Sequence, residues 1–232
     1  MIDHYDWPGG REAMLRFGPA TGPVVIAAMP LFEEANRTRA FMVSILRALA
    51  ERGIASVLPD LPGTGESLIE TEDAILTDWT TAFSSLTDML SAERSAVHGL
   101  ALRGGALVDV TARLATRWQF APASGDMLVR DLLRTRLAGG EKSPAGEAFE
   151  FSGPPVELAG NRIGRALLAQ LQAAEPAARP PLRVVRLDSD PLPADRKLAG
   201  SPLWRRSEPG NDPALAALLA DDIAGWIAPC AG

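Results

Sequence analysis

Histidine is scarce in this sequence, and its positions restrict the chemistry that the chain can perform. The 232 residues include two histidines, His4 and His98, and none follows position 98. Histidine is the most frequent acid–base side chain at neutral pH, because its pKa lies close to the pH of the solution. A catalytic site that takes its histidine from the second half of the chain is therefore excluded.

Cysteine is even rarer, and cofactor motifs are missing. The single cysteine, Cys230, rules out an internal disulfide and a cysteine-based metal cluster, so we expect no metal. The chain has no Gly-Lys-Ser/Thr phosphate loop. Gly63-Thr64-Gly65 lacks the third glycine of a dinucleotide fingerprint, since Leu68 stands at that position. We therefore expect no cofactor.

Positive charge and long apolar runs are lacking as well. The formal net charge is −6 and no basic run is present, which argues against nucleic acid as a partner. The longest apolar run, from Pro23 to Phe32, is about half the length of a membrane span. The N-terminus lacks the basic and apolar regions of a signal peptide. We expect a cytoplasmic protein without a membrane span.

Short apolar runs alternate with amphipathic segments along most of the chain. The run from Val24 to Met29 is continuously apolar, which is typical of a strand buried on both faces. The last helix should begin with Asp212 as its cap and Pro213 in its first turn. The full pattern predicts strands at 24–29, 54–58, 95–102, 116–120 and 182–187, and helices at 36–52, from 71, after 105, after 125, at 161–173 and from 213.

This alternation favours a single α/β domain over residues 1–232, with a mainly parallel sheet and helices on both faces. The polar, Gly- and Pro-rich stretch at 139–155 predicts a flap or loop region around 139–160. Ligands of such sheets bind beyond the carboxyl ends of the strands. Site residues should therefore come from the loops at 30–38, 60–68, 101–106, 121–126 and 188–195.

Residues 95–110 have the pattern of a strand, a tight turn and a helix, which is the setting of a nucleophile elbow. The elbow needs small residues two positions before and two positions after its apex. One register places Arg103 at the apex, and a second places Ala101 there. We favour the first, because it puts Gly105 where bulk is least tolerated. Neither apex is a serine, cysteine or aspartate.

The histidine of a catalytic triad is missing too. In a hydrolase of this kind the chain order is nucleophile, acid, histidine. Asp188 or Asp190, after a late strand, stands where the acid is expected, but the segment 205–212 holds no histidine. His98 falls inside a predicted strand and is interpreted as a core residue. Two of the three positions of a Ser–His–Asp triad therefore lack the required residue type.

Several segments resemble known proteins. Residues 60–67, Asp-Leu-Pro-Gly-Thr-Gly-Glu-Ser, follow a predicted strand and look like a strand–helix loop of the α/β-hydrolase superfamily. Residues 30–39, the arginine at the elbow, and the stretch from Trp118 to Arg136 resemble exosortase A system-associated hydrolase 2. The resemblance covers about residues 20–230 and implies an α/β-hydrolase fold and a link to exosortase, PEP-CTERM and exopolysaccharide systems. It carries over no nucleophile.

Arg103 is the central candidate residue. An arginine at a helix N-terminus opposes the helix dipole, and an unpaired buried guanidinium is costly, so a negative group should lie against it. Glu33, Glu34, Asp188, or a bound carboxylate or phosphate would supply that charge. Arg103 is then either a structural arginine or an anion-binding residue. The expected pocket residues are Arg103, Gly104, Glu33, Glu34, Asn36 and Arg37.

Three functions remain open at this stage. The favoured hypothesis is a non-catalytic or anion-binding accessory protein on a hydrolase fold. The first alternative is an active hydrolase or acyltransferase that uses Arg103 and a carboxylate base. The second is a structural interaction protein, which a large exposed apolar patch would favour. A small anionic ligand is the expected partner, and the sequence leaves a homo-oligomer open.

Overall fold

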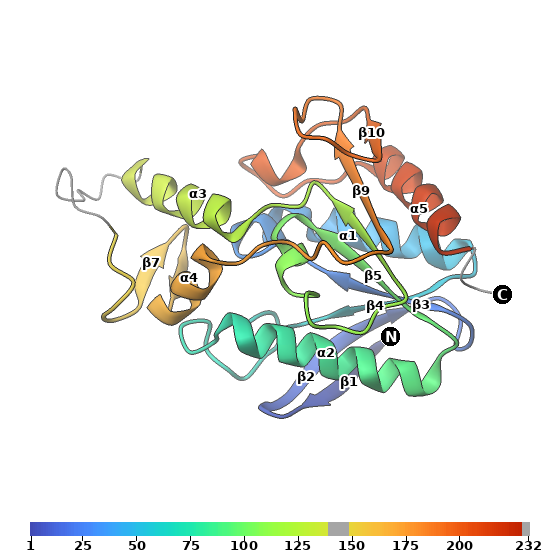
Figure 1. The fold of residues 1–232 in the computed structure, drawn as a ribbon, viewed down its shortest axis with the longest axis horizontal. Helices are drawn as coiled ribbons and strands as arrows, with labels where there is room; N and C mark the ends of the chain where they lie inside the picture. Colours follow the sequence, from blue (N-terminus) through green and yellow to red (C-terminus); the bar gives the residue numbers. More distant parts are fainter. Residues whose placement is uncertain (139–148, 229–232) are drawn as a thin grey trace.

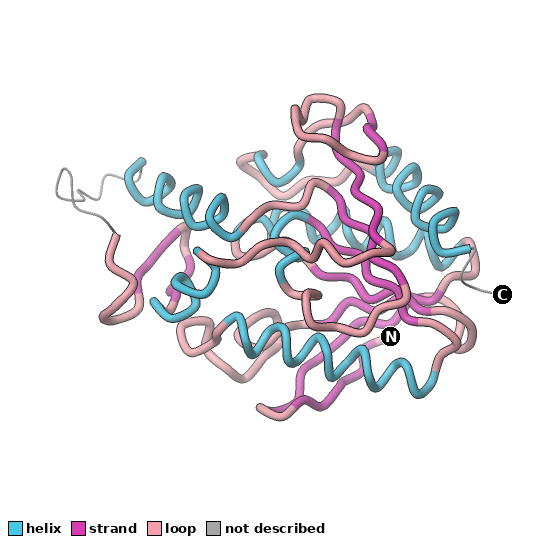
Figure 2. The backbone as a smooth tube through the Cα atoms, viewed as in Figure 1, coloured by secondary structure: helices cyan, strands magenta, loops and turns pink. Residues whose placement is uncertain are grey.

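A mostly parallel sheet runs through the molecule, with helices on both of its faces (Figures 1 and 2). The computed structural model describes residues 1–138 and 149–228, and within them the main sheet has eight strands in the order β1-β2-β4-β3-β5-β6-β9-β10. The strands are β1 (Ile2–Trp7), β2 (Gly10–Phe17), β3 (Val24–Ala28), β4 (Ala55–Pro59), β5 (Val97–Leu102), β6 (Thr116–Phe120), β9 (Leu182–Leu187) and β10 (Arg196–Leu198). The pairs β1–β2 and β2–β4 are antiparallel. The strands from β4 through β3, β5, β6 and β9 to β10 pair parallel, which confirms the predicted fold class.

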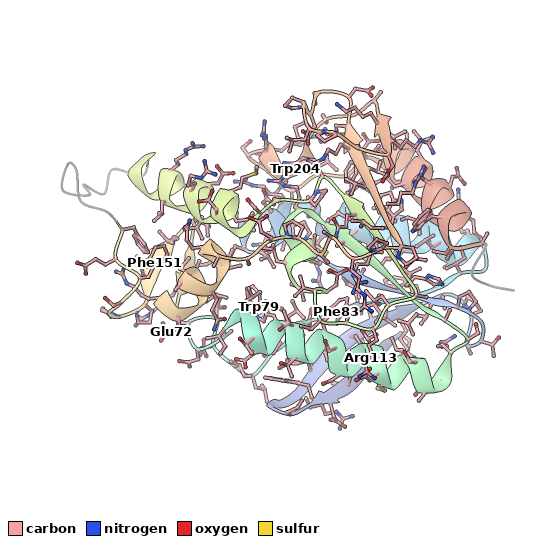
Figure 3. All side chains as sticks on the ribbon, in the orientation of Figure 1. Glu72, Trp79, Phe83, Arg113, Phe151 and Trp204 are labelled. Atoms are coloured by element: carbon pink, nitrogen blue, oxygen red, sulfur yellow. The ribbon has the colours of Figure 1, made fainter. Side chains whose placement is uncertain are left out.

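The helices divide between the two faces. They are α1 (Glu33–Glu51), α2 (Leu76–Glu93), α3 (Gly125–Ala138), α4 (Arg165–Gln172) and α5 (Pro213–Ile227), with short 3₁₀ turns η1 (Arg103–Leu107) and η2 (Leu203–Arg205). Within β3, Val24 and Ile26 pack with α2, α3 and α4, whereas Val25 packs with α1 and α5. Because successive side chains of a strand point to opposite faces of the sheet, β3 contributes to the apolar core on each face. Figure 3 shows Trp79 and Phe83 on α2, beneath the sheet.

Several predicted boundaries hold and others move. The predicted strands at 116–120 and 182–187 match β6 and β9. The Asp212 side chain accepts from the Leu215 N–H, so the predicted cap of α5 is confirmed. The helix expected from 71 begins instead at Leu76, because the Thr71 hydroxyl donates to the Gly63 carbonyl rather than capping a helix.

Three strand pairs fall where the sequence predicted none. The N-terminal segment forms the β1–β2 hairpin, and β10 adds an edge strand. Residues 161–163, predicted as helical, form β8, which pairs with β7 (Val156–Leu158) in a small separate sheet. Val156 and Leu158 are buried, so this part of the expected flap region packs into the core. Residues 139–148 of that region lie outside the described part of the chain.

The helix predicted after residue 105 is wrong. The chain makes only the 3₁₀ turn η1 and then continues irregularly to β6, with Val110 exposed. Val108, Val110 and Thr111 are β-branched and form helices poorly. Arg117 of β6 holds the segment instead, since its Nη2 donates to the carbonyls of Asp109 and Ala112.

Asp109 is almost completely buried in this irregular segment. Its carboxylate lies 3.5 Å from the Arg117 guanidinium, which is also buried. Burial raises the pKa of Asp109 to about 7, although the charge of Arg117 acts in the opposite direction.

No helix in the described part of the chain is long and apolar enough to cross a membrane.

The raised pKa of Asp109 predicts a pH dependence of stability. Between about pH 4, where a carboxyl of the unfolded chain titrates, and about pH 7, the folded state binds the extra proton. The stability that this proton supplies is therefore lost as the pH rises through about 7. Urea unfolding from pH 5 to pH 8 should show a fall in wild-type stability that is reduced in Asp109→Asn. The exposed Asp88→Asn should keep the wild-type slope, and an unchanged slope in Asp109→Asn would contradict this account.

Candidate functional site

Arg103 lies at a sharp turn at the carboxyl end of β5. Its φ is 52°, a backbone conformation that residues other than glycine rarely adopt. The turn presses η1 against β3, and a Cβ at Gly105 would lie 2.4 Å from the Ala28 carbonyl oxygen. A Cβ at Gly104 would lie 2.5 Å from Leu128 of α3. The two glycines therefore allow the close approach that holds Arg103 in this conformation.

The Arg103 side chain is buried against Glu34, in the first turn of α1. The Arg103 Nη2 lies 3.1 Å from Oε1 of Glu34, and Nε lies 3.2 and 3.3 Å from the two carboxylate oxygens. Nη1 donates to the Ala121 carbonyl oxygen at 3.2 Å. The side chains of Arg103 and Glu34 are 8% and 18% exposed. Of the three carboxylates considered from the sequence, Glu34 is the one that neutralises Arg103.

Trp204 covers the guanidinium of Arg103 from a third direction. The guanidinium carbon of Arg103 lies 4.9 Å from the centroid of the indole ring, a cation–π arrangement. Trp204 also contacts Phe120 of β6 edge-to-face, with 5.9 Å between the ring centroids. The sequence did not predict Trp204 as a site residue. The signal available was its position, because it directly precedes the segment where the catalytic histidine was expected.

Arg37 fixes the segment that carries Trp204. Its Nη1 donates to the Trp204 carbonyl oxygen at 3.0 Å, and its own carbonyl oxygen accepts from the Gly210 N–H. The guanidinium of Arg37 also pairs with Glu33, one turn earlier on α1. The first turns of α1 thus hold Arg103 through Glu34 and Trp204 through Arg37. The predicted residues Glu33, Glu34, Arg37 and Arg103 are brought together.

A cavity of about 260 Å³ opens above these residues. It lies beyond the carboxyl ends of the strands, as expected for a parallel sheet. Its lining mixes three basic and three acidic side chains with apolar ones: Leu31, Phe32, Glu33, Glu34, Arg37, Arg103, Leu128, Asp131, Leu132, Thr135, Ala159, Trp204 and Arg205. The charges in this wall are balanced within the protein.

Burial dominates the electrostatics of Glu34. It raises the pKa of the Glu34 carboxyl more than the adjacent Arg103 lowers it, and the nearby charge of Asp131 adds to the increase. Glu34 therefore takes up a proton more readily than an exposed glutamate. A carboxyl with this property that faces a cavity is chemically suited to act as a general base.

The two candidate acids do not join this site. Asp188 is exposed beyond the end of β9. Asp190 forms an ion pair with Arg186 at 2.7 Å. Burial would raise the pKa of Asp190, but the Leu192 N–H and Arg186 stabilise the carboxylate and lower it overall. Asn36 is exposed and lines a different cavity.

Both histidines lie far from Arg103. His98 is at the opposite end of β5, about 16 Å away along an extended strand, and its Nδ1 lies 2.9 Å from the Thr116 hydroxyl. Burial lowers the pKa of His98, so it is a neutral core residue. His4 is on β1, which is four strands away from β5 in the sheet. Four strand-to-strand spacings correspond to about 19 Å between β1 and β5. His4 pairs with Ala13 in the antiparallel β1–β2 hairpin.

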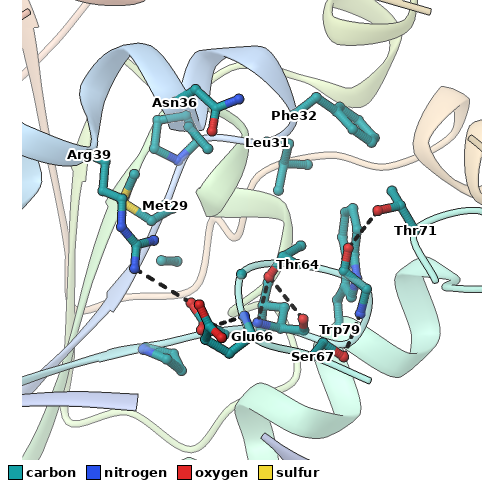
Figure 4. Close-up of a pocket in the computed structure, with 18 of the residues that line it drawn as sticks. Met29, Leu31, Phe32, Asn36, Arg39, Thr64, Glu66, Ser67, Thr71 and Trp79 are labelled. Atoms are coloured by element: carbon teal, nitrogen blue, oxygen red, sulfur yellow. Dashed lines mark hydrogen bonds and ion pairs between the residues drawn. The ribbon is translucent and has the colours of Figure 1, made fainter. Parts of the chain in front are cut away.

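A second cavity, of about 570 Å³, lies between the start of α1 and the loop after β4 (Figure 4). It meets the first cavity only at the wall formed by Leu31 and Phe32. Phe32 has a φ of 56°, so this wall contains a strained residue. Within residues 1–138 and 149–228, no cluster of three or more histidine, cysteine, aspartate or glutamate side chains could hold a metal ion.

Comparison with solved structures identifies the architecture. A serine hydrolase without a lid from Xanthomonas campestris matches 100% of this chain over 94% of its own length, with 15% identity and a TM-score of 0.58. A thermophilic esterase from Thermogutta terrifontis matches 100% of both chains, with 14% identity and a TM-score of 0.56. The chain has the α/β-hydrolase fold.

A structural neighbour described as an epimerase shares this fold as well. The bottromycin epimerase BotH, solved with bottromycin A2, matches 98% of this α/β-hydrolase-fold chain over 99% of its own length, with 15% identity and a TM-score of 0.57. No family model and no curated protein matches the sequence. At these identities the likeness shows the fold alone, and the function has to be argued from the site.

Removal of the Glu34 charge should destabilise the protein strongly. Glu34→Gln leaves the Arg103 guanidinium buried without a counter-charge, so we expect the free energy of unfolding to fall by about 3 kcal/mol. Glu33→Gln on the same turn removes a more exposed pair and should cost less than about 1 kcal/mol. Equal losses for the two variants in chemical denaturation would contradict the importance of the buried pair.

Proposed function

We propose that this chain is a non-catalytic accessory protein on the α/β-hydrolase fold, in which an internal ion pair occupies the place of a nucleophile and its base. The observation that carries this proposal is the pairing of Arg103 with Glu34 at the turn after β5. Three of the guanidinium's hydrogen-bond donors already have protein partners, and Trp204 covers the group.

The positions of the histidines support the absence of triad chemistry. Nucleophilic catalysis of the Ser–His–Asp kind needs a base within hydrogen-bond reach of the nucleophile. His98 lies about 16 Å from the turn along β5, and His4 is on a strand that lies about 19 Å from β5 across the sheet. A buried guanidinium at the turn has no nucleophilic character, because it stays protonated.

We infer the biological setting from the resemblance to exosortase A system-associated hydrolase 2. The three segments that carry the resemblance build one site. Segment 30–39 supplies Glu34 and Arg37, the turn supplies Arg103, and the stretch from Trp118 to Arg136 supplies the Ala121 carbonyl and Asp131. A site assembled from those segments supports an accessory role in an exosortase or exopolysaccharide system.

A second candidate function rests on Glu34. Its carboxylate lines the 260 Å³ cavity, lies within hydrogen-bond distance of Arg103, and has a raised pKa. A carboxylate in that state could activate a water molecule, with Arg103 orienting an anionic substrate. With water as the nucleophile this arrangement would give a hydrolase, and with the hydroxyl of an acceptor molecule in place of water it would give an acyltransferase, in both cases without a covalent intermediate.

Ester hydrolysis distinguishes the two candidates. The wild-type protein, Glu34→Gln and Arg103→Ala should all hydrolyse p-nitrophenyl butyrate and an acyl thioester at the rate of buffer alone. The reason is that the turn offers neither a nucleophile nor a base. Release of p-nitrophenolate, followed at 405 nm, is the measurement. Turnover above background that disappears in Glu34→Gln would reject the accessory role and establish the carboxylate mechanism.

A further inference from the structure

The larger cavity is a separate site with its own chemistry. It holds about 570 Å³ and is built mainly from the end of β3, the start of α1 and the loop after β4, with Trp79 and Phe83 of α2 behind it (Figure 4). Neither Arg103 nor Glu34 lines it. A volume of this size suits a small organic ligand rather than a single ion.

The lining of this cavity combines apolar side chains with polar ones. Its apolar lining comprises Ala27, Ala28, Met29, Pro30, Leu31, Phe32, Ala35, Pro59, Leu61, Ile69, Trp79 and Phe83. Thr64, Ser67, Thr71, Asn36 and Asn161 add hydroxyl and amide groups. Such a lining favours a ligand with an apolar body and a small polar group that fixes its orientation.

The charged groups in this wall are mostly negative. Of the described residues that line the cavity, Asp60, Glu66 and Glu70 carry carboxylates and Arg39 carries the opposing guanidinium. Glu66, Glu70 and Arg39 are exposed at the rim, whereas Asp60 is 8% exposed. The negative charge is therefore in excess, and one carboxylate lies deep.

The Asp60 carboxylate is incompletely compensated. Its Oδ2 accepts from the Glu66 N–H at 3.1 Å. Its Oδ1 accepts no hydrogen bond from the described residues, and the Arg39 Nη2 lies 3.8 Å away. The dashed line from Arg39 in Figure 4 marks this ion pair. A buried carboxylate normally has full hydrogen-bonded compensation, because removing its charge from water is costly.

A second buried carboxyl adds to this excess. Glu12 of β2 is 2% exposed, and its Oε2 has no hydrogen-bond partner among the described residues. Burial raises the pKa of Glu12, Ser67 and Trp7 act in the opposite direction, and the nearby charge of Asp60 raises it. Glu12 therefore adds a second buried carboxyl close to Asp60, behind the cavity wall.

We propose that the 570 Å³ cavity is a binding site for an organic cation, in which an ammonium group pairs with Asp60 and an apolar body occupies the interior. The ammonium would give the Asp60 Oδ1 the close, charge-assisted hydrogen bond that Arg39, at 3.8 Å, does not make. The aromatic rings of Phe32 and Trp79 add favourable surface for a cationic, partly apolar ligand. The proposal is independent of the accessory role assigned to the Arg103 site.

Three probes of equal length test the charge preference. They are 4-phenylbutylamine, 4-phenylbutanol and 4-phenylbutyrate, which differ only in carrying a positive, neutral or negative end group at pH 7. Calorimetric titration of the full chain should give a Kd for the amine about tenfold lower than for the alcohol, the effect of one charge-assisted hydrogen bond. The carboxylate should bind weakest.

Substitutions in the cavity wall should shift the amine Kd in opposite directions. Asp60→Asn should raise it about tenfold, whereas Arg39→Ala, which removes the competing guanidinium, should lower it about threefold. Because Asp60 is buried, the exposed pair Glu66→Gln and Glu70→Gln provides a second test that spares the core, and should raise the Kd severalfold. Arg47→Ala, elsewhere on the exposed face of α1, is the matched control and should change nothing.

The outcomes are distinct. Preferential amine binding that Asp60→Asn weakens and Arg39→Ala strengthens supports the cation site. Equal binding of the three probes, binding of the carboxylate above the amine, no binding of any probe, or insensitivity to both substitutions would overturn it. None of these results depends on ester hydrolysis, so this test and the test of the accessory role succeed or fail separately.

Discussion

The ion pair between Arg103 and Glu34 is the contact on which the arrangement of this site depends. The buried guanidinium of Arg103 has to be neutralised. Removing one partner of a buried ion pair lowers the free energy of unfolding by about 3 to 5 kcal/mol. Glu34 meets that requirement from the first turn of α1, which fixes the helix relative to η1. Arg37, one turn later, then binds the backbone of Trp204 and places the indole over the guanidinium. One charge pair thus joins the first, middle and last parts of the chain.

The same contact explains why the molecule has two cavities rather than one. Leu31 and Phe32 lie three and two residues before Glu34, so the ion pair that anchors α1 also anchors the wall that they form between the cavities. On one side of this wall Arg103 pairs with Glu34 and Arg37 pairs with Glu33. On the other side Asp60 keeps an oxygen without a hydrogen bond. At the turn after β5, where hydrolases of this fold place their nucleophile, the charge of Arg103 is already neutralised by Glu34. In the neighbouring cavity, Asp60 could still accept a hydrogen bond from a bound cation.

Strands made of continuous apolar runs and helix caps could be predicted from the sequence, whereas contacts between distant segments of the chain could not. The strands β6 and β9 and the cap at Asp212 follow from local apolar runs and capping chemistry. The β1–β2 hairpin was missed because few of its side chains are buried, and β10 because its three residues include two charged ones. The helix expected after Gly105 fails because Arg117, from another strand, binds that segment. The need for an anion near Arg103 was predictable from its charge, but the choice of Glu34 and the role of Trp204 depend on packing between distant segments.

A double-mutant cycle on Arg103 and Glu34 tests the central claim most directly. The free energy of unfolding would be measured by urea denaturation for the wild type, Arg103→Met, Glu34→Gln and the double variant. If the pair organises the site, the two substitutions are strongly non-additive, with a coupling energy of about 2 kcal/mol and a double variant no less stable than Glu34→Gln alone. Additivity within about 0.5 kcal/mol would show that the two side chains act independently and would contradict the account.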